Sequence, residues 1–212
     1  VTASQAEPLK RTGHLNVVTI DGSINPASSD YLQKAIAESE KDGAAALLLE
    51  LDTPGGLVAS TKDIIQAMLN ARVPTIVYVA PQGAWAGSAG TFITIAGNVA
   101  AMAPGSSIGA AHPVGIGGGA PSNPEEGEII VEGAKKAENL LAAFIESIAE
   151  QRKRNVEWAA KAVRESVAVT ADKALELGVI DIVAATRSDL LTQLLEHPFP
   201  FQGETVVLDV AD

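Results

Sequence analysis

The sequence predicts an α/β protein in which helices cover both faces of a mainly parallel sheet. Two aliphatic runs, Ala44–Leu51 and Thr75–Ala80, are continuous rather than alternating, which is typical of strands buried on both faces. Segments with helical periodicity separate such runs, as in folds built from repeated strand-helix units. The composition agrees, because 47% of the 212 residues are hydrophobic and only 4% are aromatic. Aliphatic side chains therefore build the core, and one domain of this length can bury it.

The first half of the chain alternates between expected strands and helices, after a loose polar lead-in over residues 1–12. Clusters of Gly, Pro and Asp mark the turns between them. The expected elements are, in order, a strand at His14–Ile20, a helix from a cap at Ser28 or Ser29 to about Lys41, the strand Ala44–Leu51, a helix at Leu57–Asn70, the strand Thr75–Ala80, a helix ending near Gly97 and the strand Val99–Met102. The run Ala44–Leu51 suits a central position in the sheet.

The second half opens with a segment rich in Gly, Pro, Ser and Glu, for which we expect a flexible flap at residues 112–132. A loop of this length in a compact domain is usually functional or disordered. The expected elements after it are a helix at Gly133–Lys153, a short helix at Asn155–Val163, a helix at Ala171–Leu177 capped by Thr170, a strand at Val179–Ala184, a helix at Asp189–Glu196 capped by Ser188, and an edge strand within residues 199–212.

Charge and composition exclude several classes of protein. The formal net charge is −11, and the basic triplet Arg152-Lys153-Arg154 is better explained as the end of a helix than as a nucleic-acid patch. The absence of cysteine excludes disulfides and a thiol nucleophile, and the three histidines lack metal-ligand spacing. We expect no metal and no cofactor. No apolar run is long enough to span a membrane, and the start at Val1 indicates a processed or shortened amino terminus.

A serine lies in a turn of small residues, Gly83-Ala84-Trp85-Ala86-Gly87-Ser88-Ala89-Gly90-Thr91, between a predicted strand and a predicted helix. The small residues allow a sharp turn and the close approach of another chain segment. A serine at the first turn of a helix, beside free amide groups, is a plausible nucleophile. The alternative is that Ser88 only caps the helix.

Two glycines follow the neighbouring strand, in Asp52-Thr53-Pro54-Gly55-Gly56. If the two loops lie side by side, a backbone amide of the Gly55-Gly56 pair and the amide of Ala89 can form an oxyanion hole, which stabilises the charge that develops on a carbonyl oxygen. We also expect Gly55, Leu57 and Gly87 to contact the substrate. The alternative for the glycine pair is a simple turn into a helix.

A serine nucleophile needs a base that accepts its proton. His112 is the one histidine in a plausible place, although it is also explained as a polar loop residue. A neutral lysine is the other known base, provided that burial or nearby positive charge favours its neutral form. Lys135 and Lys136 follow the flap at the start of a long helix, and helical geometry does not choose between them. Both are otherwise explained as solvated surface lysines.

The motifs together resemble the N-terminal protease domain of the NfeD family, membrane-bound serine proteases of the Clp/crotonase fold. The resemblance rests on Leu51–Gly56, Ala86–Thr91, Met102–Ala110 and Ala174–Asp181, in this order and spacing. It implies a Ser-Lys dyad of Ser88 and Lys136, because the family lysine precedes an apolar helix that ends in an Arg-Asn pair, here Arg154-Asn155. Two adjacent lysines and a long Gly-rich loop depart from the family pattern.

The resemblance also implies a function and partners. Relatives cleave hydrophobic segments, notably of stomatin-like membrane proteins, and form homodimers. It implies a soluble domain on the extracytoplasmic side, attached to the membrane through segments outside this sequence. Two alternatives stay open. A crotonase-type enzyme would use the same amides on acyl-CoA, with Glu50 and Asp52 as nearby carboxylates, and a non-catalytic domain would bind an apolar segment without turnover.

Overall fold

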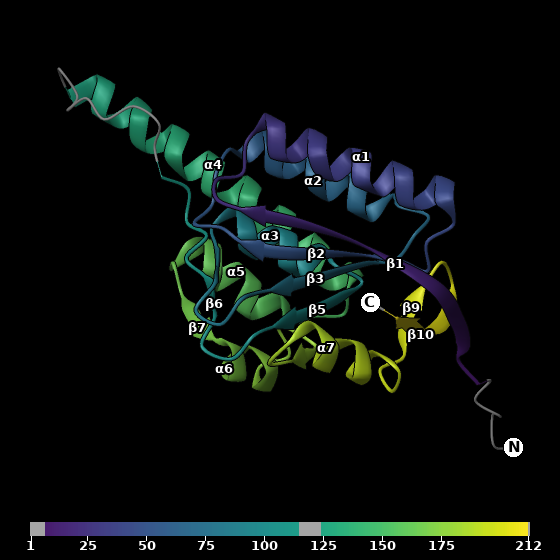
Figure 1. Cartoon of the computed structure of the whole chain (residues 1–212). Helices are drawn as coiled ribbons and strands as arrows, with labels where there is room; N and C mark the ends of the chain where they lie inside the picture. Colours follow the sequence, from purple (N-terminus) through teal and green to yellow (C-terminus); the bar gives the residue numbers. More distant parts are fainter. Residues whose placement is uncertain (1–6, 115–123, 212) are drawn as a thin grey trace, which may run out of the picture.

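A curved, mainly parallel sheet forms the centre of the computed structural model, which describes residues 7–114 and 124–211 (Figure 1). Its strands lie in the order β8-β5-β3-β2-β1-β10-β9. All neighbours in this sheet are parallel except β9 and β10. The strands are β1 (Leu9–Asp21), β2 (Ala46–Asp52), β3 (Thr75–Val79), β5 (Val99–Met102), β8 (Ile182–Val183), β9 (Phe199–Phe201) and β10 (Glu204–Ala211).

Strand β2 lies at the middle of the sheet, as its unbroken aliphatic sequence predicted. Its side chains alternate between two cores: Leu47, Leu49 and Leu51 join one, and Ala46 and Leu48 the other. Because both faces are covered, every residue of the strand except its two acids is buried.

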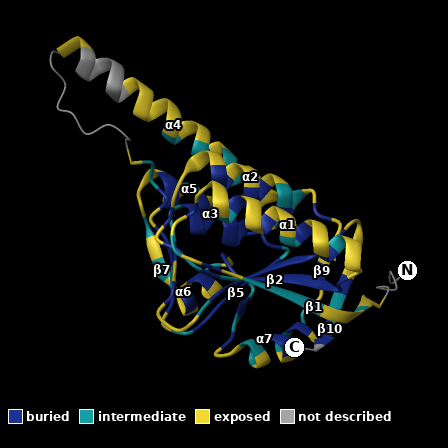
Figure 2. Ribbon diagram, turned by 45° about the horizontal axis from the view of Figure 1, so that its top comes forward, coloured by how far each residue is buried: buried dark blue, intermediate teal, exposed yellow. Residues whose placement is uncertain are grey.

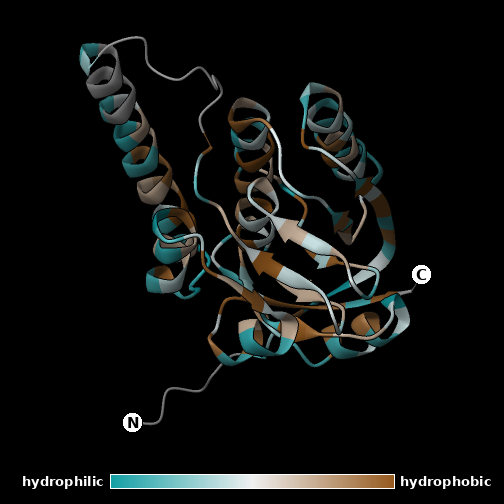
Figure 3. Cartoon of the chain, turned by 90° about the vertical axis from the view of Figure 1, so that its left-hand side faces the viewer, coloured by the Kyte–Doolittle hydropathy of each residue, from teal (hydrophilic) through white to brown (hydrophobic). Residues whose placement is uncertain are grey.

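Helices cover the two faces unequally (Figures 1 and 3). The larger core contains residues of six helices, namely α1 (Pro26–Asp42), α2 (Val58–Leu69), α3 (Ala89–Ala96), α4 (Pro124–Gln151), α5 (Val156–Arg164) and α6 (Ala171–Glu176). The smaller core lies under α7 (Arg187–Leu194) and the β9–β10 hairpin. The short helix α6 (Ala171–Glu176) precedes β8, and Thr170 caps it as expected.

A small second sheet stands beside the main one. It contains β4 (Trp85–Gly87), β6 (Ser107–Gly109) and β7 (Ala168–Thr170). A parallel bridge between Thr53 and Ala86 connects the loop after β2 to β4. The two loops that carry the expected site residues are therefore joined by backbone pairing at the carboxyl ends of β2 and β3.

The chain ends differ from the expectations in two ways. The predicted lead-in over residues 1–12 is wrong from Leu9 on, because Leu9–His14 pair with β10 in the first half of a long β1. Residues 199–212 do contain an edge strand, β9, but they also contain β10, which lies inside the sheet between β1 and β9. Both differences have one cause, since β1 and β10 pair across almost 200 residues of sequence.

The predicted flap at residues 112–132 is only partly described. Its residues 115–123 lie outside the described residues, whereas helix α4 already begins at Pro124, nine residues before the expected start. Proline and acidic residues favour the first turn of a helix, and the composition of the segment obscured this signal. In Figures 1 and 2 the first part of α4 extends away from the body of the protein.

Several helix ends also differ. Asn25, not Ser28 or Ser29, caps α1, and it accepts hydrogen bonds from the amides of Ala27 and Ser28. Thr186, not Ser188, caps α7. In both cases the residue that caps the helix lies earlier in the sequence than the expected one. Its side-chain oxygen accepts a hydrogen bond from a backbone amide of the first turn, as the expected residue would have done, because several neighbouring Asn, Ser and Thr side chains can take this position.

Candidate functional site

Ser88 stands on a sharp strand-to-helix turn between β4 and α3, as predicted. Its backbone has φ 50° and ψ −113°, a conformation that non-glycine residues rarely adopt. The amide of Ser88 donates to the carbonyl of Gly109 at 3.0 Å, which holds the turn in place. The Ser88 hydroxyl makes no capping hydrogen bond to α3. The helix-cap explanation for this serine is therefore wrong, and its oxygen stays available for chemistry.

The loop after β2 packs directly against this turn because glycines, which have no side chain, lie where the two segments come closest. A Cβ on Gly55 would lie 2.6 Å from the Cβ of Ser88, and Gly55 has φ +125°. A Cβ on Gly90 would lie 2.6 Å from Cγ2 of Thr53. Such contacts are closer than any real Cβ tolerates, so glycine is required at both positions. Thr53 further holds the loop, since its hydroxyl accepts from the Gly55 amide at 3.1 Å.

Two amides beside Ser88 have no acceptor among the described residues: those of Gly56 and Ala89. The Gly56 loop is fixed by a bridge to Ile24, whose carbonyl accepts from the Leu57 amide at 2.9 Å and leaves the Gly56 amide free. Ala89 is the first residue of α3, where helix geometry provides no internal acceptor. Free amides at a helix N-terminus favour a negative charge. The arrangement can stabilise an oxyanion formed next to Ser88.

Two arginines bind the opposite end of α3. Arg154 donates to the carbonyls of Ile95 at 3.0 Å and Gly97 at 2.8 Å, and Arg152 donates to that of Ala96 at 2.8 Å. Arg154 also pairs with Asp181 at 2.8 Å. Burial, and then the neighbouring Arg154, lower the pKa of Arg152 to about 10, so the Arg152 side chain remains charged at neutral pH. The basic triplet thus follows the end of a helix, as expected, but Arg152 and Arg154 bind the C-terminal carbonyls of α3 rather than those of α4.

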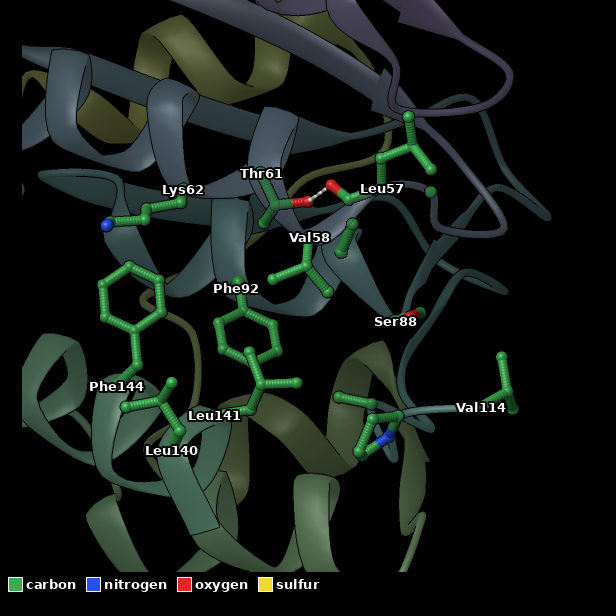
Figure 4. A pocket seen from close by; sticks show the side chains of 14 residues that line it. Leu57, Val58, Thr61, Lys62, Ser88, Phe92, Val114, Leu140, Leu141 and Phe144 are labelled. Atoms are coloured by element: carbon green, nitrogen blue, oxygen red, sulfur yellow. Dashed lines mark hydrogen bonds between the residues drawn. The ribbon is translucent and has the colours of Figure 1, made fainter. Parts of the chain in front are cut away.

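An apolar cavity of about 300 Å³ opens beside Ser88 (Figure 4). Helix α3 forms its floor, and α2 and α4 form its walls. Leu140 of α4 lines this cavity and is 73% exposed. The lining residues are Gly56, Leu57, Val58, Thr61, Lys62, Ser88, Ala89, Phe92, Ala111, Pro113, Val114, Leu140, Leu141 and Phe144. The expected substrate residue Leu57 is therefore part of this cavity.

A second cavity, of about 240 Å³, lies on the other side of Ser88. Gly87, Trp85 and Ile108 line it, and Trp85 is 59% exposed. Ser88 lines both cavities, so a bound chain can pass the serine with side chains in each. Gly55 lines neither cavity. It packs against the side chain of Ser88 from the loop after β2.

Neither candidate lysine lines either cavity. The Lys136 amine lies 2.7 Å from Oε1 of Glu132, and its side chain is 75% exposed. Helix geometry nevertheless distinguishes the two lysines. Lys136, Leu140 and Phe144 follow at intervals of four residues, which keep them on one side of α4 that faces the cavity, whereas Lys135 points about 180° away from Phe144. Lys136 lies one turn beyond the cavity wall.

The family model of the NfeD1b N-terminal domain matches residues 14–197 of this chain. The chain belongs to the NfeD1b family. Its curated relatives include the membrane-bound protease PH1510 of Pyrococcus horikoshii, 34% identical over 206 residues, or 96% of this chain and 45% of the relative. They also include the membrane protein NfeD1b of Bacillus subtilis, 27% identical over 191 residues, or 84% of this chain and 40% of the relative. The chain thus spans less than half of the length of these relatives.

Solved structures agree with the family. A serine-to-alanine variant of the 1510-N membrane-bound stomatin-specific protease matches with a TM-score of 0.80 at 30% identity, covering 95% of this chain and 98% of that chain. A lysine-to-alanine variant of the same protease, in complex with a substrate peptide, matches with 0.79 at 31% identity, covering 98% and 92%. The expected Clp/crotonase-type fold of this NfeD1b domain is thereby confirmed.

His112 lines neither of the two cavities beside Ser88. Its Nδ1 lies 2.8 Å from the carbonyl oxygen of Val163, and Glu138 lies 4.0 Å away. His112 therefore packs toward α4 and α5, while its neighbours Ala111 and Pro113 line the cavity.

One cavity residue of this NfeD1b domain was not expected from the sequence. Lys62 of α2 lines the cavity at the end opposite Ser88 (Figure 4). Its spacing from Gly56 on a predicted helix was the available signal, since the residues at positions one, two, five and six after Gly56 all line the cavity. No helix of the described chain is long and apolar enough to cross a membrane.

Proposed function

We propose that this domain is a serine endopeptidase in which Ser88 is the nucleophile and Lys136 is the general base. The observation that carries the proposal is the Ser88 turn: a hydroxyl that caps nothing, next to two free amides and at the mouth of an apolar cavity. A related protease, solved once with a serine and once with a lysine replaced, supports the assignment of the activity.

The proposed reaction proceeds in two stages. Neutral Lys136 accepts the proton of Ser88 as Oγ attacks the peptide carbonyl carbon, and the amides of Gly56 and Ala89 stabilise the oxyanion. Protonated Lys136 then donates its proton to the leaving amine as the C–N bond breaks, which leaves an acyl-enzyme. Water, deprotonated by Lys136, attacks the ester, and the proton returns to Ser88 as the acid product leaves.

Lys136 must change its surroundings for this role. Its side chain is exposed, and its amine lies against Glu132 rather than against Ser88. Leu140, one turn further along α4, is exposed at the cavity rim in the same way. A substrate that fills the cavity covers this side of α4, removes water from it and favours a neutral lysine. We therefore expect Lys136 to leave Glu132 and approach Ser88 only when substrate is bound.

The cavity supports an apolar peptide segment as substrate. Its rim carries four exposed aliphatic side chains, those of Leu57, Val58, Val114 and Leu140. Such contiguous exposed apolar surface usually marks a binding site. Because the related 1510-N protease is specific for a stomatin homologue, we propose a stomatin-like membrane protein as the partner. We further propose a homodimer, held on the extracytoplasmic side by membrane segments outside this sequence.

Cleavage of a hydrophobic peptide by the purified domain and by a Ser88→Ala variant tests the proposal. We expect the variant to lose at least about 10³-fold in kcat, because the attacking oxygen is gone. A serine-directed acylating probe should label Ser88 and no other residue. Peptide binding without turnover in the unaltered domain would instead support the non-catalytic alternative, and tight acyl-CoA binding would support the crotonase-type one.

A further inference from the structure

The apolar cavity contains one charged residue, Lys62, among the described residues that line it. Lys62 lies on the second turn of α2, on the wall opposite α4. Other lysines of this acidic chain lie within 4.0 Å of a carboxylate oxygen: Lys10, Lys34, Lys41, Lys136, Lys161 and Lys173. Within the part of the chain that the structure describes, Lys62, Lys135 and Lys153 have no such pair, and of these three Lys62 alone lines the cavity. Lys62 also makes no hydrogen bond there.

Thr61, the polar neighbour of Lys62 in the cavity lining, does not offer a free hydroxyl to a charged group of a ligand. The hydroxyl of Thr61 donates to the carbonyl of Leu57 at 2.8 Å and is thereby occupied (Figure 4). Lys62 is exposed where it lines the cavity, and an apolar ligand that fills the cavity removes water beside the ammonium group, which strengthens its attraction to an anion. A ligand that fills the cavity therefore gains by placing a carboxylate next to Lys62.

Helix geometry gives the distance between this cation and the reacting centre. Lys62 lies four residues after Val58, the first residue of α2, a helical rise of about 6 Å, and the two steps from Gly56 to Val58 add up to about 7 Å of non-helical chain, so an extended peptide covers the whole in about three or four residues. In Figure 4, Lys62 and Ser88 lie at opposite ends of the cavity with Val58 and Phe92 between them. A substrate chain passing Ser88 thus reaches Lys62 after filling the cavity with apolar side chains.

We propose that Lys62 is a specificity-determining residue, which selects apolar peptide segments that carry a carboxylate about three or four residues from the scissile bond. This inference rests on the proposed protease function. The carboxylate comes either from an acidic side chain or from the free C-terminus of the substrate. Lys62 takes no part in the bond-breaking steps.

The test is a scan of Glu along an amidated apolar peptide, with Gln at the same positions as the uncharged reference. Mass spectrometry identifies the cleaved bond. We expect cleavage about three or four residues from Glu, with kcat/KM about fivefold above the Gln peptide, as for a well-placed ion pair. The preference should vanish in Lys62→Ala and reverse toward a Lys-containing peptide in Lys62→Glu. A peptide with a free C-terminal carboxylate at that distance distinguishes the two sources.

Lys34→Ala is the matched control, since Lys34 is an exposed lysine of α1 outside the cavity and its loss changes the net charge equally. Equal cleavage of Glu and Gln peptides by the unaltered domain, or a preference that survives Lys62→Ala, would overturn the proposal. So would loss of all cleavage in Lys62→Ala, which would make Lys62 the base.

Failure of the proposed protease function gives a different result. The unaltered domain would then cleave none of these peptides. Binding of the Glu and Gln peptides to the Ser88→Ala variant, followed by fluorescence anisotropy, still tests Lys62: we expect about fivefold tighter binding of the Glu peptide, lost in Ser88→Ala/Lys62→Ala and weakened by salt. Equal binding of both peptides would overturn the inference by itself.

Discussion

At the residue scale, the site depends on glycines, whose missing side chains allow close packing and leave a backbone amide accessible. Gly55 allows the loop after β2 to touch Ser88, and Gly56 presents an amide without a side chain in front of it. The positive φ of Ser88 turns its hydroxyl away from capping geometry. Such strained conformations cost about 1–3 kcal/mol and persist only where the surroundings enforce them. Here Gly109 and Thr91 do so through hydrogen bonds to the same turn.

Replacing the proposed base separates the two neighbouring lysines. We expect Lys136→Ala to lower kcat by about 10²–10⁴-fold, because no group then accepts the serine proton. Lys135→Ala should keep most activity, since Lys135 lies on the other side of α4. Steady-state cleavage of an apolar peptide by the two variants checks this. Loss of activity only in Lys135→Ala would reassign the base to Lys135.

Adding a methyl group behind the nucleophile should also impair the reaction. In Gly55→Ala the new Cβ would lie 2.6 Å from the Cβ of Ser88, so the serine must move. A displacement of about 1 Å costs roughly 100-fold in rate. Gly83→Ala is the control, because Gly83 also has positive φ, 85°, but no atom lies within 4 Å of its added Cβ. Similar kcat values for both variants would contradict this argument.

At the scale of elements, α3 is fixed at both ends by groups distant in sequence. All its residues are buried, its N-terminus faces the cavity, and its last carbonyls accept hydrogen bonds from Arg152 and Arg154. Because positive charge at the C-terminus stabilises a helix dipole, the arginines stabilise the helix that carries the Ala89 amide. Helices α2 and α4 then face each other across α3 and enclose the apolar cavity.

Removal of one of these arginines should destabilise the fold. Arg154→Ala leaves Asp181 and two α3 carbonyls without this partner in a buried place, which costs about 3–5 kcal/mol. Arg164→Ala is the control, because Arg164 pairs with Glu138 at the surface and such a pair contributes at most about 1 kcal/mol. Urea unfolding measures both. Equal midpoints would show that Arg154 does not hold α3.

At the scale of the whole molecule, the two ends of the chain close the sheet together. The first part of β1 pairs with β10, and β9 completes the edge. Phe199 and Phe201 lie in the smaller core, and the Arg11 guanidinium lies 5.3 Å from the ring centroid of Phe201. The hairpin thus covers the face of the sheet away from the catalytic cavity.

Truncation of this hairpin's core should therefore affect stability and leave the chemistry intact. We expect Phe201→Ala to lower the free energy of unfolding by about 3–5 kcal/mol, as for other buried aromatic side chains. The kcat of the folded fraction should stay unchanged, because the residue lies in the other core. Denaturant unfolding and peptide cleavage on the same sample test both statements. A fall in kcat would indicate coupling between the two cores.

Local sequence patterns were sufficient to predict the central strands and the turn that carries Ser88. The continuous aliphatic runs predicted the central strands, and the small residues around Ser88 predicted the turn and its two neighbouring amides. Those features depend on a few adjacent residues and on backbone sterics. The partners of β1 and β10, the two arginines at the end of α3 and the wall that α4 adds to the cavity depend on contacts between distant segments. Only the tertiary structure decided them, because the energy of such contacts arises from packing that no local pattern encodes.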